Sequence, residues 1–206
     1  MNKPYSESCD QNREPIFDVI QPLLANKKHV LEVGSGTGQH AVYFAKKMPH
    51  LIWQTSDQIA YHAGIKQWLS DADLSNTPPP LKLDVSNDTW PNVNDDTQNL
   101  KQGYDVIFSA NAVHIMSWQN VLDFINNAGK LLESKGLFIL YGPFNYNNAY
   151  TSESNARFDV WLKNNNPESG IRNFETINEL AEERSLRLIN DYSMPANNRI
   201  LAWVKQ

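Results

Sequence analysis

The chain has 206 residues, of which 41% are hydrophobic and 20% charged, and its formal net charge is -5. This composition is typical of one globular domain and excludes a disordered or fibrous protein. The acidic balance leaves no general basic surface for a phosphate backbone or an anionic membrane, so we expect neither a nucleic-acid partner nor a membrane partner.

Two features of the sequence indicate a cytoplasmic location. The only cysteine, Cys9, has no partner for an intramolecular disulfide, which favours a reducing compartment. The first fifteen residues hold no apolar run of signal-peptide length, and no apolar stretch approaches the roughly 20 residues of a membrane span. We expect a single cytoplasmic domain over residues 1–206, with residues 1–11 as a flexible tail.

The spacing of apolar residues alternates between helix and strand along the chain. A leading amphipathic helix is expected over 14–25, with Pro15 in its first turn and a bend or break at Pro22. Strands apolar on both faces belong in a sheet covered by helices on both sides, which predicts a doubly wound α/β fold. The expected strands are 29–33, 51–55, 81–83, 104–110, 136–141, 186–190 and 199–204, and the expected helices are 39–48, 59–69, 121–132, 153–162 and 175–184.

A glycine-rich segment, residues 34–38, follows the first predicted strand. An open parallel sheet binds ligands outside the carboxyl ends of its strands, and glycine lets the backbone approach a ligand closely. The third glycine, Gly38, comes one place earlier than in the dinucleotide fingerprint G-x-G-x-x-G. The segment therefore predicts a ligand-binding loop, and the alternative is a tight strand-to-helix turn with no ligand.

Acidic residues stand at the ends of the first three predicted strands. They are Glu32, Asp57 and Asp84, and in such a sheet their carboxylates can line one cleft. Asp57 is placed to accept hydrogen bonds from both ribose hydroxyls of a nucleoside, and Asp84 from an adenine amino group. Glu32 can hold an ammonium group directly or through the loop backbone. Several carboxylates without lysine or arginine in the loop suit a cationic ligand better than a pyrophosphate. S-adenosylmethionine, with its sulfonium and amino groups, is such a ligand.

The motif VLEVGSGTGQH at residues 30–40, followed by Asp57, Asp84 and the strand at 105–111, resembles the ordered motifs of class I S-adenosylmethionine-dependent methyltransferases. Over residues 12–204 the chain also resembles the methyltransferase-like 26 family, a group of predicted enzymes. The segments that carry this second resemblance are 39–45, 53–57, 141–144, 151–155, 170–172 and 194–198. The resemblance implies S-adenosylmethionine as the cofactor and a Rossmann-like, seven-stranded, mostly parallel sheet in the order 3-2-1-4-5-7-6 with its last strand antiparallel. It implies no acceptor.

The expected cofactor site combines the loop, the acidic strand ends and two residues before the first helix that fold over the ligand. The alternative for those two residues is a solvated tail. The predicted cofactor-binding residues are Asn12, Arg13, Glu32, Gly34, Ser35, Gly36, Thr37, Gly38, Asp57, Asp84, Val85 and Asn111.

Methyl transfer needs alignment of the reactants, exclusion of water and in some enzymes a base. The fourth strand adjoins the first, so Asn111 and His114 are expected beside the reacting methyl group, with His114 taking a proton. The alternative for His114 is a hydrogen-bonded structural histidine. Asn111 does not begin the N/D-P-P-Y/F tetrapeptide of amide-nitrogen methyltransferases, which disfavours that reaction. The predicted catalytic residues are His114, Glu153 and Tyr141.

Residues 142–172 are expected to form a lid that recognises a small polar acceptor, an acidic one if Arg172 faces inward. The alternative is that Ser152 and Glu153 cap a helix and Arg172 pairs with a surface carboxylate. No histidine and carboxylate cluster has metal-ligand spacing, so no metal is expected. The predicted substrate-binding residues are Tyr146, Ser152, Ser154, Asn155, Arg172 and Asn197.

These observations predict an S-adenosylmethionine-dependent methyltransferase, EC 2.1.1.-, that acts on a small molecule. One alternative is a protein that binds S-adenosylmethionine or S-adenosylhomocysteine and transfers nothing. A nicotinamide dehydrogenase is disfavoured by the glycine spacing and by the lack of a Tyr-x-x-x-Lys pair. The sequence leaves the acceptor and the oligomeric state open.

Overall fold

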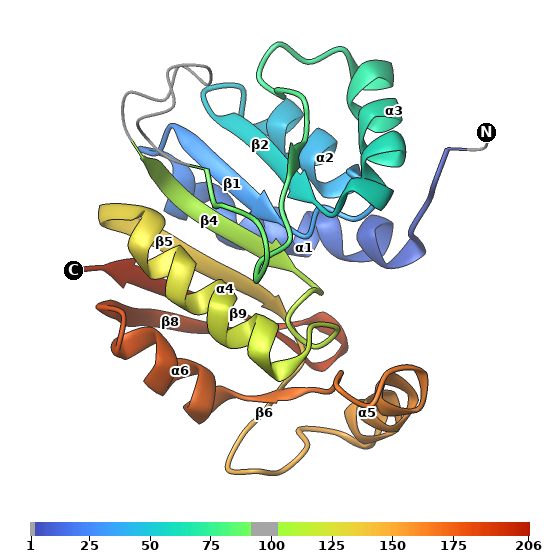
Figure 1. The fold of residues 1–206 in the computed structure, drawn as a ribbon, viewed down its shortest axis with the longest axis vertical. Helices are drawn as coiled ribbons and strands as arrows, with labels where there is room; N and C mark the ends of the chain where they lie inside the picture. Colours follow the sequence, from blue (N-terminus) through green and yellow to red (C-terminus); the bar gives the residue numbers. More distant parts are fainter. Residues whose placement is uncertain (1–2, 92–102) are drawn as a thin grey trace.

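A seven-stranded sheet forms the centre of the computed structural model, which describes residues 3–91 and 103–206 (Figure 1). The strand order is β3-β2-β1-β4-β5-β9-β8, and β9 runs antiparallel to its neighbours β5 and β8. This arrangement confirms the predicted α/β class, the predicted order and the antiparallel last strand. The strands are β1 His29–Val33, β2 Ile52–Asp57, β3 Leu81–Lys82, β4 Tyr104–Ala110, β5 Leu132–Gly142, β8 Leu186–Met194 and β9 Asn198–Lys205.

Helices cover both faces of the sheet. They are α1 Glu7–Leu24, α2 Gln39–Lys47, α3 His62–Ala72, α4 Trp118–Leu131, α5 Glu153–Asn165 and α6 Phe174–Glu182. Short 3₁₀ turns follow β2 at Ile59–Tyr61 and β8 at Pro195–Asn197, and a separate two-stranded ladder pairs β6 Phe144–Asn145 with β7 Arg172–Asn173. The chain therefore builds the covered sheet that its apolar strands predict.

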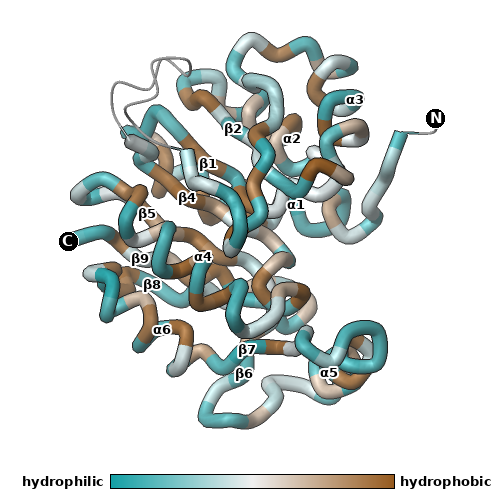
Figure 2. The backbone as a smooth tube through the Cα atoms, viewed as in Figure 1, coloured by the Kyte–Doolittle hydropathy of each residue, from teal (hydrophilic) through white to brown (hydrophobic). Residues whose placement is uncertain are grey.

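The hydrophobic core lies in two layers, one on each face of the sheet. Side chains of α1, α2 and α3 pack against Val106 and Phe108 of β4 on one face. Side chains of α4 and α6 pack against Ile107 on the other face. Successive residues of β4 point to opposite faces, so both must be apolar, and Figure 2 shows hydrophobic stretches along β4 and β5.

The N-terminal region differs from its prediction. Helix α1 begins at Glu7, so residues 7–11 are helical and not part of a tail, and Pro15 lies inside the helix instead of in its first turn. Ser6 starts the helix, because its side chain accepts a hydrogen bond from the Cys9 N–H. The helix also continues through Pro22. Burial of its apolar face against the sheet outweighs the hydrogen bonds that the two prolines remove.

The other predicted elements are present with shifted ends. Strands β5 and β8 are longer than predicted, 132–142 and 186–194. The arrowheads of β1, β4 and β5 in Figure 1 point toward the side of the molecule where α5 and the beginning of α1 lie. The carboxyl ends of the central strands therefore meet two helices that are far apart in the sequence.

The turn from β1 into α2 depends on glycines with left-handed backbone angles. Gly38, at the start of α2, has φ +89°, and a Cβ built there would lie 3.2 Å from the Cα of Ile65 in α3. Gly36 has φ +57°, and a Cβ there would meet no atom within 4 Å. Gly38 thus permits both the turn and the close approach of α2 to α3.

We expect Gly38→Ala to lower the free energy of unfolding by about 2–5 kcal/mol, because left-handed strain adds to crowding against the α3 backbone. Gly36→Ala is the control, with an expected loss of about 1–2 kcal/mol from strain alone. Urea denaturation measures both. Equal losses in the two variants would contradict the packing role of Gly38.

Candidate functional site

A cleft of about 1250 Å³ opens at the carboxyl ends of β1, β2, β4 and β5. The glycine loop, the beginning of α1, the segment after β4 and helix α5 line it. Its volume exceeds the roughly 300–1,000 Å³ of a pocket for one drug-sized ligand, so it has room for two small molecules. The predicted site residues that line it are Asn12, Gly34, Ser35, Gly36, Thr37, Asp57, Asn111, His114, Tyr141, Ser154 and Asn155.

The glycine loop is held in shape by hydrogen bonds to strand β2. The backbone N–H groups of Gly34 and Ser35 both donate to the Ser56 carbonyl, at 3.0 and 3.1 Å. The backbone N–H of Gly36 donates to the Asp57 carboxylate at 2.7 Å. The side of Gly36 where a Cβ would stand is empty and belongs to the cleft. The contacts with β2 therefore hold the loop in shape, and they leave space for a ligand beside the loop backbone.

Asp57 presents a half-buried carboxylate to the cleft at the end of β2. Its Oδ1 accepts a hydrogen bond from the Gln58 N–H, and its Oδ2 accepts the one from Gly36. Burial raises the pKa of the Asp57 carboxyl, and these two backbone donors act in the opposite direction. Each oxygen keeps acceptor capacity, which suits a ligand with neighbouring hydroxyl groups.

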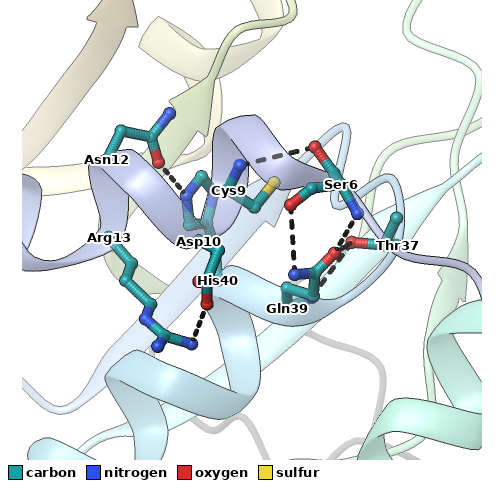
Figure 3. A network of polar contacts seen from close by, with 8 residues as sticks. All are labelled: Ser6, Cys9, Asp10, Asn12, Arg13, Thr37, Gln39 and His40. Atoms are coloured by element: carbon teal, nitrogen blue, oxygen red, sulfur yellow. Dashed lines mark hydrogen bonds and ion pairs between the residues drawn. The ribbon is translucent and has the colours of Figure 1, made fainter.

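The beginning of α1 is tied to the glycine loop through the side chain of Gln39 (Figure 3). Gln39 Oε1 accepts from the Ser6 N–H at 2.6 Å and from Thr37 Oγ1 at 3.0 Å, and its Nε2 donates to the Ser6 carbonyl at 3.2 Å. Gln39 is buried, so these bonds are shielded from water. They bring the first turn of α1 to the cleft.

Asn12 and Arg13 are neighbours in α1 but point in different directions. Asn12 lines the cleft, and its Oδ1 lies 2.7 Å from Nε2 of His40. Burial lowers the pKa of His40 to about 4, so that ring is neutral near pH 7. Arg13 pairs with Asp10 at 2.6 Å, and its side chain is outside the lining of the cleft, contrary to prediction. A helix turns by about 100° per residue, so Arg13 lies on a different side of α1 from Asn12.

His114 follows β4 and lines the middle of the cleft. The ring is 5% exposed and lies edge-on to Phe158 of α5, with a centroid distance of 5.3 Å. Burial, with a smaller contribution from the charge of Arg172, lowers the pKa of His114 to about 4. The imidazole is neutral near pH 7 and has a lone pair that can accept a proton.

Asn111 and Tyr141 lie at the ends of two neighbouring strands. Asn111 has a left-handed backbone, φ +57°, and its N–H donates to the Tyr141 carbonyl at 2.9 Å. This turn directs the chain after β4 along the cleft, and asparagine tolerates the left-handed conformation better than most residues. Burial raises the pKa of the Tyr141 hydroxyl, and the amides of Asn12 and Asn198 beside it act in the opposite direction. The hydroxyl is therefore protonated near pH 7.

Arg172 does not face into the cleft as an anion receptor. Its guanidinium donates to the carbonyls of Val113 at 3.3 Å, Glu168 at 2.8 Å and Met116. Arg172 thus fastens the segment that carries His114 to the turn before β7. Backbone carbonyls thus take its Nε and Nη2 donors, and Arg172 does not line the cleft, contrary to the prediction that it faces an acidic acceptor.

Several other predicted substrate residues have structural contacts. Ser152 caps α5 by accepting from the Asn155 N–H at 3.1 Å. Glu153 is 95% exposed and pairs with Arg157 on the outer surface of α5. Tyr146 donates its hydroxyl to Asp191 at 2.8 Å. Asn197 lies behind α5, where its carbonyl accepts from Asn155 and its amide donates to Ser154. None of these four lines the cleft, and Glu153, predicted to be catalytic, lies on the exposed surface of α5.

Glu32, Gly38, Asp84 and Val85 also lie outside the lining of the cleft. Glu32 is 2% exposed and accepts a hydrogen bond from Trp53 Nε1 at 3.2 Å. Burial raises the pKa of Glu32 to about 7, although this hydrogen bond acts in the opposite direction. Asp84 accepts from the Ser86 N–H, and Val85 is buried in the core. The predicted direct contact of Glu32 with an ammonium group is wrong, because the side chain is buried in the protein.

The sequence prediction missed residues that contribute to the cleft from α2, α5 and the turn after α5. These are His40, Phe158, Trp161 and Glu168. Phe158 and Trp161 are three residues apart on α5, a spacing that predicts a shared face but not what that face covers. Trp161 is 59% exposed at the cleft.

Neither a metal site nor a membrane span is visible in the described part of the chain. Within residues 3–91 and 103–206, no three His, Cys, Asp or Glu side chains gather closely enough to hold a metal ion. Among the described helices, none is both long and apolar enough to cross a bilayer.

Comparison with known proteins gives one family and a set of similar folds. The family model described as "Protein of unknown function (DUF938)" matches residues 3–205. The S-adenosylmethionine-dependent methyltransferase SibL superimposes with a TM-score of 0.77 at 18% identity, over 96% of this chain and 55% of that one. Mitomycin 7-O-methyltransferase MmcR gives 0.78 at 14% identity, over 95% and 54%. Human N-acetylserotonin methyltransferase in complex with SAM gives 0.78 at 12% identity, over 97% and 53%.

These likenesses establish the fold of the chain. The chain spans slightly more than half the length of the three solved structures.

Burial of Glu32 should make the stability of the protein depend on pH. Its carboxyl loses a proton near pH 4.5 when unfolded and near pH 7 when folded, so the folded chain binds more protons between these values. The contribution of Glu32 to the free energy of unfolding therefore falls as the pH rises from 4.5 to 7. We expect Glu32→Gln to gain up to about 3 kcal/mol over the natural chain between pH 4.5 and pH 7, with no further gain above pH 7.

Urea denaturation of both proteins from pH 5 to pH 8 measures this difference. The glutamine carbonyl can still accept from Trp53, so the variant removes the charge and keeps the hydrogen bond. A difference that is constant with pH would show that Glu32 is ionised in the folded protein.

Proposed function

This chain belongs to the DUF938 family of proteins of unknown function, and we propose that it is an S-adenosylmethionine-dependent methyltransferase with a small-molecule acceptor. The observation that carries the proposal is the pairing, across one cleft, of an open glycine loop beside Asp57 with the neutral ring of His114. Two proteins of similar fold support S-adenosylmethionine as the cofactor. SibL is an S-adenosylmethionine-dependent methyltransferase, and human N-acetylserotonin methyltransferase was solved in complex with SAM.

The residues at the glycine-loop end fit an adenosyl ligand. A Cβ at Gly36 would stand in open space, so a ligand can lie directly against the backbone there. We propose that Asp57 accepts from the ribose hydroxyls and that Asn12 lies along the amino acid end. Glu32 would act only through the loop above it, by its backbone carbonyl, which accepts from the Ser35 and Ser56 hydroxyls. Asp84 and Val85 as adenine contacts remain part of this proposal.

The charges of the cleft also suit this ligand. Among the described residues, Asp57 and Glu168 are the acidic side chains that line it, and no lysine or arginine does. A sulfonium is favoured beside carboxylates, whereas a pyrophosphate would lie near negative charge without a cationic partner. This argues against a nicotinamide cofactor in the same cleft.

The methyl donor supplies an electrophilic carbon whose bond to sulfur breaks with both electrons remaining on sulfur. The protein must then align the acceptor, exclude water and take the acceptor's proton. We propose that His114 accepts this proton on its neutral ring and that Asn111 and Tyr141 orient the acceptor. Phe158 covers one side of His114 and helps to exclude water.

Three finer features belong to the same proposal. Residues 142–172, which contain α5, would act as the lid over the acceptor. The chain would be a member of the methyltransferase-like 26 group, with an activity of class EC 2.1.1.-. It would work in the cytoplasm on a metabolite.

Binding of the cofactor tests the proposal first. We expect S-adenosylmethionine and S-adenosylhomocysteine at about 100 times their dissociation constants to raise the melting temperature by about 5–10 °C, and NAD to leave it unchanged. Asp57→Ala should abolish the rise, because the ribose hydroxyls lose their acceptor. Asp18→Ala, an exposed aspartate of α1, is the matched control. No rise with either adenosyl ligand would overturn the proposed function.

A methyl-transfer assay distinguishes an enzyme from a protein that only binds the cofactor. The natural chain, supplied with a methyl-labelled donor and a protein-free metabolite extract, should label a small product. His114→Asn should reduce this labelling about 10²–10⁴-fold through loss of the base, while cofactor binding persists. Cofactor binding without any labelled product would favour the binding protein, and unchanged labelling in the variant would remove His114 from the mechanism.

A further inference from the structure

We propose that the acceptor is a planar, largely apolar molecule that carries no anionic group. The inference rests on the proposed function, since it concerns the second ligand of the same cleft. It follows from the side chains at the end of the cleft away from the glycine loop, which neither the family match nor the similar folds describe for this chain.

Two apolar walls from different elements line the acceptor end of the cleft. Phe158 and Trp161 of α5 form one wall, and Ile115 and Met116, after β4, form the other. Trp161 and Ile115 are 59% and 57% exposed, although both are large apolar residues. Exposed apolar side chains gathered at the mouth of a cleft indicate a surface that a ligand covers.

The aromatic side chains of this end combine a stacked pair with an edge-on ring. The rings of Phe158 and Trp161 are 5.8 Å apart with an interplanar angle of 12°, so they are stacked. The ring of His114 stands edge-on to Phe158, at an interplanar angle of 71°. A planar molecule can therefore stack on the exposed indole or meet the ring edges, both of which are favourable aromatic geometries.

The charges at this end exclude an anion. Within the described residues, Glu168 is the charged side chain that lines the acceptor end, and lysine and arginine are absent from the lining of the whole cleft. Arg172, the nearest candidate, donates instead to the carbonyls of Val113, Met116 and Glu168. A carboxylate or phosphate on the acceptor would lose its hydration without gaining a cation. A neutral molecule has no such cost, and a cation gains from Glu168.

Neutral polar groups remain to orient the reacting atom. His114 and Asn111 lie between the two ends of the cleft, and Ser154 lies on the side of α5. These groups can hydrogen-bond a hydroxyl or an amine but do not balance a charge. The acceptor is therefore an apolar ring system with a hydroxyl or amine as its methylated group.

Three probes that share the naphthalene ring system but differ in charge test this inference. They are 2-naphthol, 2-naphthylmethylamine and 2-naphthoate, which are neutral, cationic and anionic at pH 7.5. Each is titrated by calorimetry into the full chain saturated with S-adenosylhomocysteine. We expect the neutral and cationic probes to bind at least about tenfold more tightly than 2-naphthoate, a difference of about 1.4 kcal/mol.

Variants locate the binding at the proposed walls. Trp161→Ala should lower the affinity for 2-naphthol about two- to tenfold, because the stacking contact is lost. Val160→Ala changes the exposed neighbour on α5, which does not line the cleft, and should leave the affinity unchanged. Glu168→Lys should narrow or reverse the preference against 2-naphthoate, because it places a cation where the carboxylate was.

The outcomes separate the two proposals. Failure of S-adenosylhomocysteine to bind overturns the proposed function and this inference with it. Binding of S-adenosylhomocysteine with 2-naphthoate as the tightest probe, or with no detectable binding of the neutral and cationic probes, overturns this inference alone. Equal effects of Trp161→Ala and Val160→Ala would remove the α5 wall from the acceptor site.

Discussion

The cleft depends on one turn, in which the glycine loop is bound to the end of β2. The Ser56 carbonyl accepts the N–H groups of Gly34 and Ser35, and the Asp57 carboxylate accepts that of Gly36. These bonds require positive φ angles at the glycines, which side chains would strain. Because the same carboxylate holds the loop and faces the cleft, the architecture of the turn and the candidate binding group are inseparable.

The opposite side of the cleft is organised by the buried carboxylate of Asp159 and the partly buried guanidinium of Arg172. Asp159 of α5 is 1% exposed and accepts from Tyr150 Oη, Lys163 Nζ and the Ile171 N–H, at 2.7, 2.6 and 2.7 Å. Arg172 satisfies the carbonyls of the segment that carries His114. Charged groups that are fully hydrogen-bonded inside a protein fix one arrangement of the chain, because partly satisfied alternatives are costly. Both residues therefore hold the segments that carry His114 and α5 in place beside the cleft.

Burial gives the cleft neutral polar groups. His40 and His114 have pKa values lowered to about 4, and Glu32 behind the loop has its pKa raised to about 7. In each case desolvation disfavours the charged form more than neighbouring groups favour it. The protein thus presents to its ligands mostly hydrogen-bonding groups without charge, with Asp57 as the exception at the glycine-loop end.

The sequence by itself determined the α/β class and the position of the cleft, and the resemblance to class I methyltransferases implied the strand order. Apolar alternation, the spacing of Gly34, Gly36 and Gly38, and the acid at the end of β2 are local patterns, and local patterns persist in the folded chain. Only the tertiary structure decided which polar side chains enter the cleft. Arg172 was predicted to be a substrate ligand, but it donates to the carbonyls of Val113 and Met116, which are distant from it in sequence. The sequence does not indicate what Trp161 faces, whereas in the structure it lines the cleft, because the direction of a side chain depends on how its whole helix packs.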